Sequence, residues 1–150
     1  MQIINIKINL HRQTMPKNKK PNYIYAVGRR RTSSARVRLF RGKGDSSVNG
    51  IVIDKYFPGD INKNLWMKPF KTADVVDKYY VTVRVVGGGK MGQLDAVVHG
   101  ISRTLVKVDS DTFKPLLKKA GLLTRDPRIR ERRKVGMGGK ARRKKQSPKR

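Results

Sequence analysis

Three glycines in the middle of the sequence have the spacing of a phosphate-binding motif. Gly87, Gly89 and Gly92 spell G-x-G-x-x-G after a strand-like stretch and at the start of a helix-like one. In dinucleotide-binding domains such glycines let a pyrophosphate approach the N-terminus of a helix, and an acid further along binds the ribose. Asp109 and Asp111 lie near the distance expected for that acid. A nucleotide-dependent enzyme is therefore the first hypothesis to test.

The segments after these glycines argue against a dinucleotide site. Such a site needs a second parallel strand after the helix. Here residues 109–121 predict a further helix, and the chain then becomes strongly basic. Two interpretations of the glycines remain open. They bring backbone amides close to a phosphate, here one of RNA, or they allow a strand and a helix to pack tightly without any ligand.

Other reactive side chains give no better enzyme. Ser33 and Ser34 have no histidine nearby in the sequence, and the acids of residues 45–124 are all Asp without evident pairing. The lysines that follow a glycine lack the adjacent Ser or Thr of a phosphate-binding loop. With no cysteine and only His11 and His99, the chain cannot form the usual zinc clusters. We therefore expect no enzymatic activity, no cofactor, no metal ion and no small-molecule substrate.

The charge of the chain points to a polyanionic partner instead. The 150 residues include 37 Lys and Arg against 10 Asp and Glu, which gives a net charge of +27. A free globular domain gains nothing from such self-repulsion, so nucleic acid is the first candidate partner and an anionic membrane the second. No segment approaches the about 18 consecutive apolar residues of a spanning helix, because Arg84 interrupts the best run, residues 79–86. We expect a nucleic-acid-binding protein without a membrane partner.

The excess charge is concentrated at the two ends of the chain. The first 44 residues carry +12, the last 26 carry +11 and the 80 between them carry +4, while all 10 aromatic residues lie between Tyr23 and Phe113. We predict a basic N-terminal extension over 1–22 and one α+β RNA-binding domain over 23–124. An extended basic tail over 125–150 should be disordered without its partner.

The first residues fit neither the domain nor a targeting signal. Residues 1–14 lack the apolar segment of a signal peptide and the Ser- and Arg-rich composition of a transit peptide. Because Met15 begins a plausible shorter chain, we expect that 1–14 reflect a mis-assigned start. Peptide mapping of the native protein that finds Met1 or Gln2 would contradict this.

Strands are predicted early in the domain and helices late. Alternating or β-rich segments predict strands at 23–27, 35–41, 47–53 and 79–86, the second and third forming a hairpin. Helical spacing and caps predict a short helix capped by Asp60 and a second piece with Pro69 in its first turn that runs through Val76. They also predict a helix after the glycines through Val108 and one capped by Asp109 or Asp111 that Gly121 ends. His99 lies one turn before Arg103, which predicts a polar-face or RNA-facing histidine. This order of elements favours α+β over a doubly wound sheet.

Several motifs together resemble the small-subunit ribosomal protein nine family. The first is the glycine-rich stretch Gly87–Gln93, which continues through Ala96, His99-Gly100-Ile101, Arg103 and Leu105. Further motifs occur in the family's order: Gly28-Arg29-Arg30, Ser34-Ala35-Arg36-Val37, Asn49-Gly50, Tyr56-Phe57-Pro58, Lys119-Ala120-Gly121-Leu122, Thr124-Arg125-Asp126, Glu131–Gly136, Ala141-Arg142-Arg143 and Lys149-Arg150. The ordered set covers residues 23–150 and is far more specific than any one motif.

The resemblance implies a fold, a place and partners. The implied fold is a small mixed sheet packed against helices, like domain two of small-subunit ribosomal protein five, with a left-handed β-α-β crossover and extended basic tails. The implied place is the head of the small subunit in a cytoplasmic ribosome, with an organellar ribosome also compatible. The implied partners are ribosomal RNA, neighbouring head proteins and peptidyl-site transfer RNA, whose anticodon arm the terminal Lys149 and Arg150 approach. Ser147 and Pro148 depart from the family's usual ending, which affects the geometry of the tail tip.

The predicted ribosomal-RNA-binding residues are mostly arginines and lysines of the tails and of the motifs. They are Arg29, Arg30, Arg31, Arg36, Arg38, Lys90, Gln93, Arg103, Arg125, Arg128, Arg130, Arg132, Arg133, Lys134, Lys140, Arg142, Arg143, Lys144 and Lys145. The tail lacks aromatic residues, so its recognition should rest on RNA shape and phosphates. If about eight phosphates are bound, affinity should fall with log salt at a slope near −6.

A free-standing nucleic-acid compactor, chromatin-like or RNA-chaperone-like, is the rival class. It predicts low-complexity tails whose residues have no particular order. The observed tail mixes Thr124-Arg125-Asp126-Pro127, Glu131 and several glycines in a defined order. This order favours one path along a structured RNA.

Overall fold

The computed structural model describes residues 22–132 of the chain. The expectations for the start of the chain, for tail disorder and for the tail tip lie outside these residues. The described elements are β1 Ile24–Arg30, β2 Ser33–Arg41, β3 Ser47–Val48, β4 Ile51–Val52, α1 Ile53–Tyr56, α2 Asp60–Thr72, β5 Tyr79–Val86, α3 Lys90–Val108 and α4 Ser110–Lys119.

The strands form one mixed sheet in the order β1-β2-β5-β3-β4. β1 pairs antiparallel with β2, and β2 with β5, while β3 runs parallel to β5. The chain passes from β3 to β5 through β4, α1 and α2, which makes a crossover between adjacent parallel strands. The predicted α+β class with a small mixed sheet is confirmed, and the handedness of the crossover stays a prediction.

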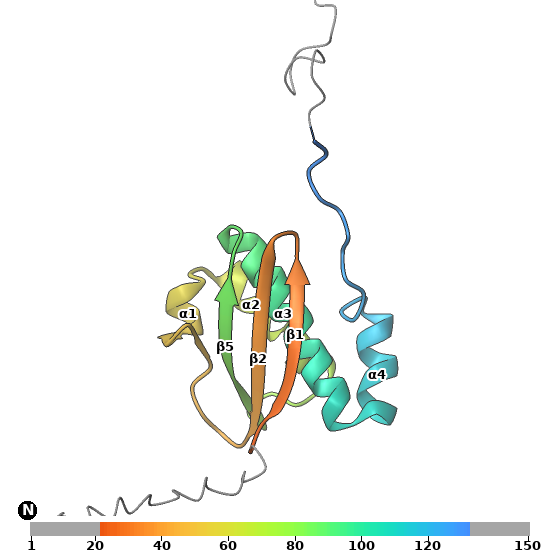
Figure 1. The fold of residues 1–150 in the computed structure, drawn as a ribbon. Coiled ribbons are helices and arrows are strands. Elements are labelled where there is room, and N and C mark those ends of the chain that lie inside the picture. Colours follow the sequence, from red (N-terminus) through yellow and green to blue (C-terminus); the bar gives the residue numbers. More distant parts are fainter. Residues whose placement is uncertain (1–21, 133–150) are drawn as a thin grey trace, which may run out of the picture.

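The helices cover one face of the sheet and leave the other open (Figure 1). α3 packs on β1 and β2, with α2 beside it and α4 on its outer side. As the alternation predicts, Ala35, Val37 and Leu39 point into the core, and so do the odd-numbered valines of β5. The predicted helical stripe of α3 meets them with its buried Leu94, Val97, Ile101 and Leu105. Figure 1 also shows the chain entering at one end of the sheet and leaving near the opposite end.

The third predicted strand was wrong in extent and in partner. Residues 47–53 divide into the two-residue strands β3 and β4, because Asn49 and Gly50 adopt φ values of 51° and 82° and turn the chain. Ile53 already belongs to α1. The expected hairpin between 35–41 and 47–53 does not form. β2 is already paired on both sides, by β1 and β5.

Two helix starts also differ from the prediction. Gly59, with φ 101°, precedes α2 as its N-cap, so Asp60 is the first helical residue and not the cap. Pro69 does not begin a new piece, because α2 continues through it with the proline ring buried, and the helix ends at Thr72 instead of Val76. The predictions for α4 are confirmed. Asp109 accepts hydrogen bonds from the backbone N–H groups of Asp111 and Thr112, and Gly121, with φ 72°, follows the helix end.

Backbone contact between β1 and α3 brings this helix unusually close to the sheet. A Cβ added at Gly28 would overlap the carbonyl oxygen of Ala96 and the backbone of Gly100. A Cβ added at Gly100 would lie 2.5 Å from Cγ2 of Val37. Only glycine fits at these two positions, and α3 side chains can therefore reach the backbone of β1.

Residues 22–132 contain neither a membrane-spanning helix nor a metal-binding cluster. Among residues 22–132, no helix has the length and hydrophobicity to cross a bilayer. The same residues contain no cluster of three His, Asp or Glu side chains arranged to hold a metal ion.

Candidate nucleic-acid interface

The open face of the sheet carries a cluster of arginines. The alternation that buries Val37 and Val83 turns Arg36, Arg38 and Arg84 outward. The register of β2 and β5 places Arg36 directly opposite Arg84, and Arg38 opposite Thr82. None of the strand residues on this face of β1, β2 and β5 is acidic. Like charges directly across a sheet repel each other and destabilise it, so this arrangement suits a bound anion.

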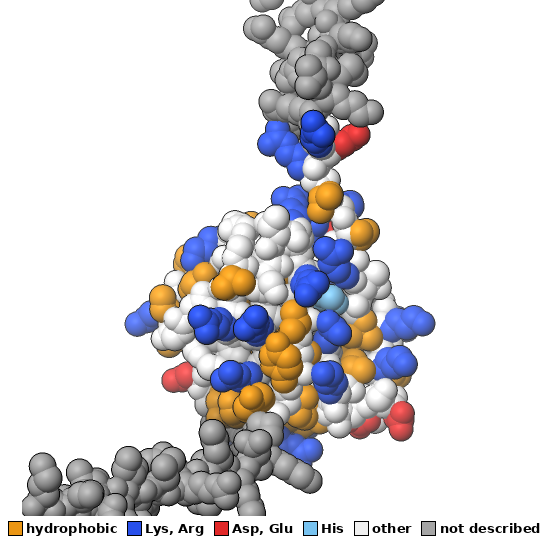
Figure 2. All heavy atoms as spheres, in the orientation of Figure 1, with side chains coloured by type: hydrophobic (Ala, Val, Ile, Leu, Met, Phe, Trp, Pro, Cys, Tyr) orange, Lys and Arg blue, Asp and Glu red, His pale blue; other side chains and the backbone are white. Residues whose placement is uncertain are grey.

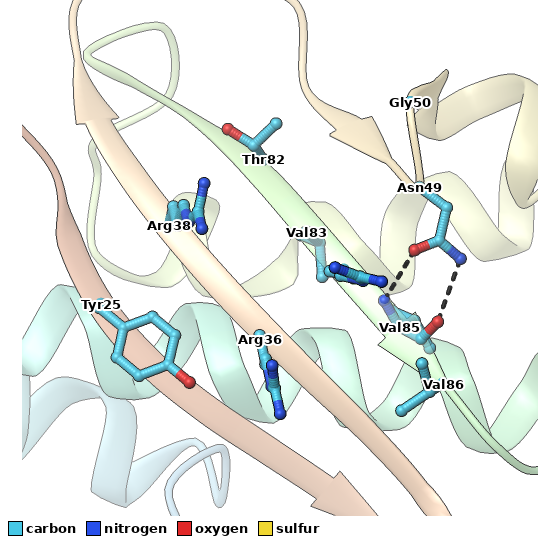
Figure 3. Close-up of a pocket in the computed structure, with 10 residues that line it drawn as sticks. Tyr25, Arg36, Arg38, Asn49, Gly50, Thr82, Val83, Val85 and Val86 are labelled. Atoms are coloured by element: carbon cyan, nitrogen blue, oxygen red, sulfur yellow. Dashed lines mark hydrogen bonds between the residues drawn. The ribbon is translucent and has the colours of Figure 1, made fainter. Parts of the chain in front are cut away.

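The arginine cluster borders a shallow hollow of about 650 Å³ (Figure 3). Tyr25 of β1 and Val86 of β5 line it together with the arginines. On its far side the amide of Asn49 pairs with the backbone of Val85, accepting from N–H at 2.9 Å and donating to C=O at 3.1 Å. These two bonds continue the sheet at the turn between β3 and β4.

Aromatic rings close one end of the same face. Phe40 stacks on Tyr80 with ring centroids 5.1 Å apart, and Tyr23 lies against Phe40 at 5.7 Å. The guanidinium of Arg38 lies 5.1 Å from the Tyr23 ring centroid. In Figure 2, Lys and Arg side chains surround a hydrophobic strip on this face, and acidic side chains lie only at its margins. The face therefore offers cations for phosphates beside apolar surface for sugars or bases.

The glycine-rich loop between β5 and α3 packs against the β1–β2 turn. A Cβ added at Gly87 would lie 2.5 Å from the carbonyl oxygen of Thr32, and one at Gly88 would overlap the Ser33 hydroxyl. The Ser33 hydroxyl and the Gln93 amide both donate to the carbonyl oxygen of Gly87, at 3.1 and 3.0 Å. This supports the interpretation of tight packing for Gly87 and Gly88.

Open space remains at the start of α3. A Cβ added at Gly89 would meet no atom within 4 Å. Beside it, the ammonium of Lys90 lies 3.5 Å from the centroid of the Tyr56 ring, a cation–π contact. The Tyr56 hydroxyl in turn donates to Oε1 of Gln93 at 2.9 Å. Gln93 thus holds the loop in shape, and the phosphate interpretation stays open for Gly89 and Lys90.

Three side chains of α3 bond to the outer backbone of β1 and form what we call the edge ladder. Lys107 donates to the carbonyl oxygen of Tyr25 at 2.7 Å, and Arg103 to that of Val27 at 2.5 Å. The backbone N–H of Arg29 points to Nδ1 of His99 at 3.4 Å. Steps of four residues on a helix rise about 6 Å and steps of two on a strand about 6.6 Å, so the partners stay in phase.

His99 is used on both sides of its ring. Nδ1 accepts from Arg29, so the proton lies on Nε2, which is 3.2 Å from the carbonyl oxygen of Leu123 and donates to it. Burial is the main cause that lowers the pKa of His99, with the positive charge of Arg103 adding to it. The expected polar or RNA-facing histidine is instead a half-buried neutral link between β1 and the segment after α4.

Beside this histidine, Arg30 binds the start of the basic tail. We call its contacts with Asp126, Arg128 and Asp95 the clasp. Arg30, with a side chain only 11% exposed, lies 2.9 Å from the carboxylate of Asp126 through one terminal nitrogen. The other terminal nitrogen donates to the carbonyl oxygen of Arg128 at 2.6 Å. Its Nε lies 3.6 Å from Asp95 on α3. Hydrogen bonds from the Arg128 side chain are the main cause that holds the pKa of Asp126 well below its ordinary value.

Comparisons with known proteins identify the family of this chain. A family model described as ribosomal protein S9/S16 matches residues 28–150. The chain belongs to the ribosomal protein S9/S16 family. The small ribosomal subunit protein uS9 of Desulfovibrio desulfuricans is 47% identical over 113 residues, which are 75% of this chain and 86% of that protein. The match to this S9/S16 chain extends over nearly all of the described residues and the tail.

Two further relatives in the same comparison are longer than the region that matches. The uS9 protein of Cutibacterium acnes is 45% identical over 112 residues, 75% of this chain and 65% of that protein. The uS9 protein of Leifsonia xyli is 46% identical over 112 residues, 75% of this chain and 67% of that protein. The S9/S16 chain thus spans about two thirds of the length of these two relatives.

The structure places the predicted RNA-binding residues of this S9/S16 chain in different surroundings. Among those that the structure describes, most are exposed, whereas Gln93 is partly buried in the loop contacts and Arg30 is buried in the clasp. Arg36 and Arg38 come together on the open face. The exposed ones are Arg29, Arg31, Arg36, Arg38, Lys90, Arg103, Arg125, Arg128, Arg130 and Arg132. Those outside the described residues are Arg133, Lys134, Lys140, Arg142, Arg143, Lys144, Lys145, Lys149 and Arg150.

Sequence reasoning missed the other members of the open face. Arg84, Tyr25 and Thr82 lie there but were not predicted as binding residues. The alternation of residues 79–86 contained the signal for Arg84, since it sits between the core residues Val83 and Val85 and must point the other way. In the sequence, Arg84 stands out only as an interruption of an apolar run.

Proposed function

We propose that this chain is a structural constituent of the small ribosomal subunit that binds ribosomal RNA. The open face of its sheet docks on RNA phosphates, and its basic tails run along RNA beyond the domain. Membership of the S9/S16 family and the names of the uS9 relatives support the ribosomal setting. The chain acts by shape and charge and is not an enzyme.

One observation carries the proposal, namely the pairing of Arg36 with Arg84 across the open face, with Arg38 beside them. Without a partner, three neighbouring guanidinium groups on a helix-free face weaken the sheet by mutual repulsion. A phosphate backbone reverses the sign of this interaction, because each arginine can grip one phosphate with two hydrogen bonds. The net charge of +27 extends the same attraction over the whole chain.

The tail tip completes the proposed role. Lys149 and Arg150 approach the anticodon arm of transfer RNA in the peptidyl site and support it electrostatically. The support for this step is the family match, which continues to residue 150. The protein lies in the head of the small subunit of a cytoplasmic ribosome, next to other head proteins.

Sedimentation tests the ribosomal assignment. A cell lysate is washed with high salt and separated on a sucrose gradient, and the protein is quantified by mass spectrometry. We expect it to stay with small subunits in equal proportion to their other proteins. Release of the protein to the top of the gradient, or its spreading over all nucleic acid, would favour a free-standing nucleic-acid compactor instead.

Removing the two terminal charges tests the contact with transfer RNA. Subunits that carry Lys149→Gln and Arg150→Gln should assemble normally but bind peptidyl-site transfer RNA about two- to thirtyfold more weakly. This range corresponds to two exposed ion pairs of about 0.2–1 kcal/mol each. The matched control removes Lys114 and Lys118 of α4 in the same way. Equal binding by both variants would refute the role of the tip.

A further inference from the structure

Arg30 differs from the exposed RNA-binding arginines predicted within the described residues, because each of its three guanidinium nitrogens already has a protein partner. Nε lies 3.6 Å from Asp95, and the two terminal nitrogens contact Asp126 and the carbonyl oxygen of Arg128. The side chain is 11% exposed. The five N–H donors of a guanidinium form a fixed fork. Because all three nitrogens face protein partners and the side chain is mostly buried, little of this group is left to grip a phosphate.

The partners of Arg30 belong to the first residues of the basic tail. Asp126 turns the chain locally, since its carboxylate accepts from the backbone N–H and from the side chain of Arg128. Arg30, the last residue of β1, binds this turn through Asp126 and the carbonyl oxygen of Arg128. The clasp therefore spans 98 positions in sequence and joins the first strand of the domain to the tail.

A second contact fixes the same segment a few residues earlier. His99 of α3 binds the carbonyl oxygen of Leu123 at 3.2 Å while it accepts from the backbone of β1. Between α4 and the turn at Asp126 the chain is thus held at two points, one on α3 and one on β1. Two fixed points define a direction, so the chain leaves the domain along one path (Figure 1).

We propose that Arg30 is a positioning residue for the tail. It holds the turn at Asp126 against the end of β1, so that the tail meets its RNA site already aligned. The inference rests on the proposed function, because alignment has an effect only if the tail binds RNA. Without the clasp, the base of the tail must be ordered when it binds. Affinity should then fall about tenfold, which corresponds to fixing the backbone of roughly one residue.

The geometry is tested in the free protein with spin labels. The chain has no cysteine, so cysteines placed at Lys118 and Glu131, both exposed, label α4 and the tail base alone. Pulsed electron spin resonance should give one narrow distance distribution for the full-length chain. Arg30→Gln should broaden it, while Arg130→Gln, which removes the same charge from the tail, should not. Asp126→Asn weakens the same contact from the tail side and should broaden the distribution in the same way. It provides a second test in case Arg30→Gln does not fold.

The RNA step is tested by titrating full-length chains with small-subunit RNA at several salt concentrations. Arg30→Gln should weaken binding about tenfold and leave the salt slope unchanged, because Arg30 neutralises Asp126 and not a phosphate. Arg130→Gln should reduce the slope by about 0.7–0.9, the value for one lost phosphate contact. Arg30→Lys, which can still pair with Asp126, should recover part of the affinity.

The outcomes separate the inference from the proposed function. A wild-type slope near zero would overturn the proposed function and the inference together. With a normal wild-type slope, the inference alone falls if Arg30→Gln keeps the narrow distance distribution. It also falls if that variant lowers the slope as much as Arg130→Gln does, because Arg30 would then contact phosphate directly.

Discussion

Replacing Arg84 by threonine should change two properties of the chain in opposite directions. Arg84 faces Arg36 across the open side of the sheet, with Arg38 as a further neighbouring cation. Removing it relieves the repulsion in the free protein, and threonine suits a strand. The same change removes one cation from the proposed RNA surface. The free protein should therefore become more stable while its RNA complex becomes weaker.

Both magnitudes follow from the pair geometry. A directly opposed cross-strand pair contributes about 0.2–1 kcal/mol, which for a domain of this size raises the midpoint of thermal unfolding by about 1–4 °C. On the RNA side, one lost phosphate contact reduces the salt slope by about 0.7–0.9. Extrapolated from 1 M to 0.1 M salt, that change weakens binding by a factor of about six.

Calorimetry of the free full-length chain and RNA titration over a range of salt concentrations measure the two effects. Lys114→Gln removes the same charge from exposed α4 and should leave both nearly unchanged. In a chain that already carries Arg36→Thr, the gain from Arg84→Thr should largely vanish, because the repelling partner is gone. A variant that loses stability and keeps full RNA affinity would refute the reasoning, since Arg84 would then support the sheet and contact no RNA.

Two further predictions concern the frame that carries this surface. Gly28→Ala should lower the free energy of unfolding by at least about 1–3 kcal/mol, because its methyl group overlaps the backbone of α3. An added methyl group at Gly89 meets no atom within 4 Å, so Gly89→Ala should change the free energy of unfolding by less than about 1 kcal/mol. Denaturant titration measures both variants, and an equal loss of stability in the two would contradict the packing argument. His99 has a lowered pKa in the folded chain, so its contribution to stability is present above its unfolded value near 6.5 and is lost as the pH falls through the folded pKa. The free energy of unfolding, measured between pH 7.5 and 5.5, should show this loss in the wild type and in the control His11→Gln but not in His99→Gln. If His99→Gln keeps the pH dependence of the wild type, the assignment of the loss to His99 is refuted.

The alternation of residues 35–41 and 79–86 was sufficient to predict the core face of the sheet, because one outward residue separates each buried residue from the next. The same alternation carries Arg84 outward, but strand periodicity does not reveal which residue lies opposite. The pairing of Arg84 with Arg36 depends on the register of two strands that are far apart in sequence. A sequence pattern could therefore predict the face but not the charged pair on it.

Local signals were overridden or overlooked elsewhere. Asn49-Gly50 is a strong signal for a two-residue hairpin turn, and it divides the predicted strand 47–53. The proline at 69 reads as a helix start, yet α2 continues through it because its ring is buried in the core. The clasp of Arg30 with Asp126 has no local signal at all, since its members come from opposite ends of the domain.

The edge ladder has a consequence for the chain before it meets any RNA. An uncovered strand edge is a template on which another protein strand can add, and repeated addition leads to aggregates. Along β1 the carbonyl groups of Tyr25 and Val27 are already bonded, and the side chains of Arg103 and Lys107 occupy the row where an incoming strand would lie. Each newly made copy thus carries its own barrier against pairing with the next copy along this edge.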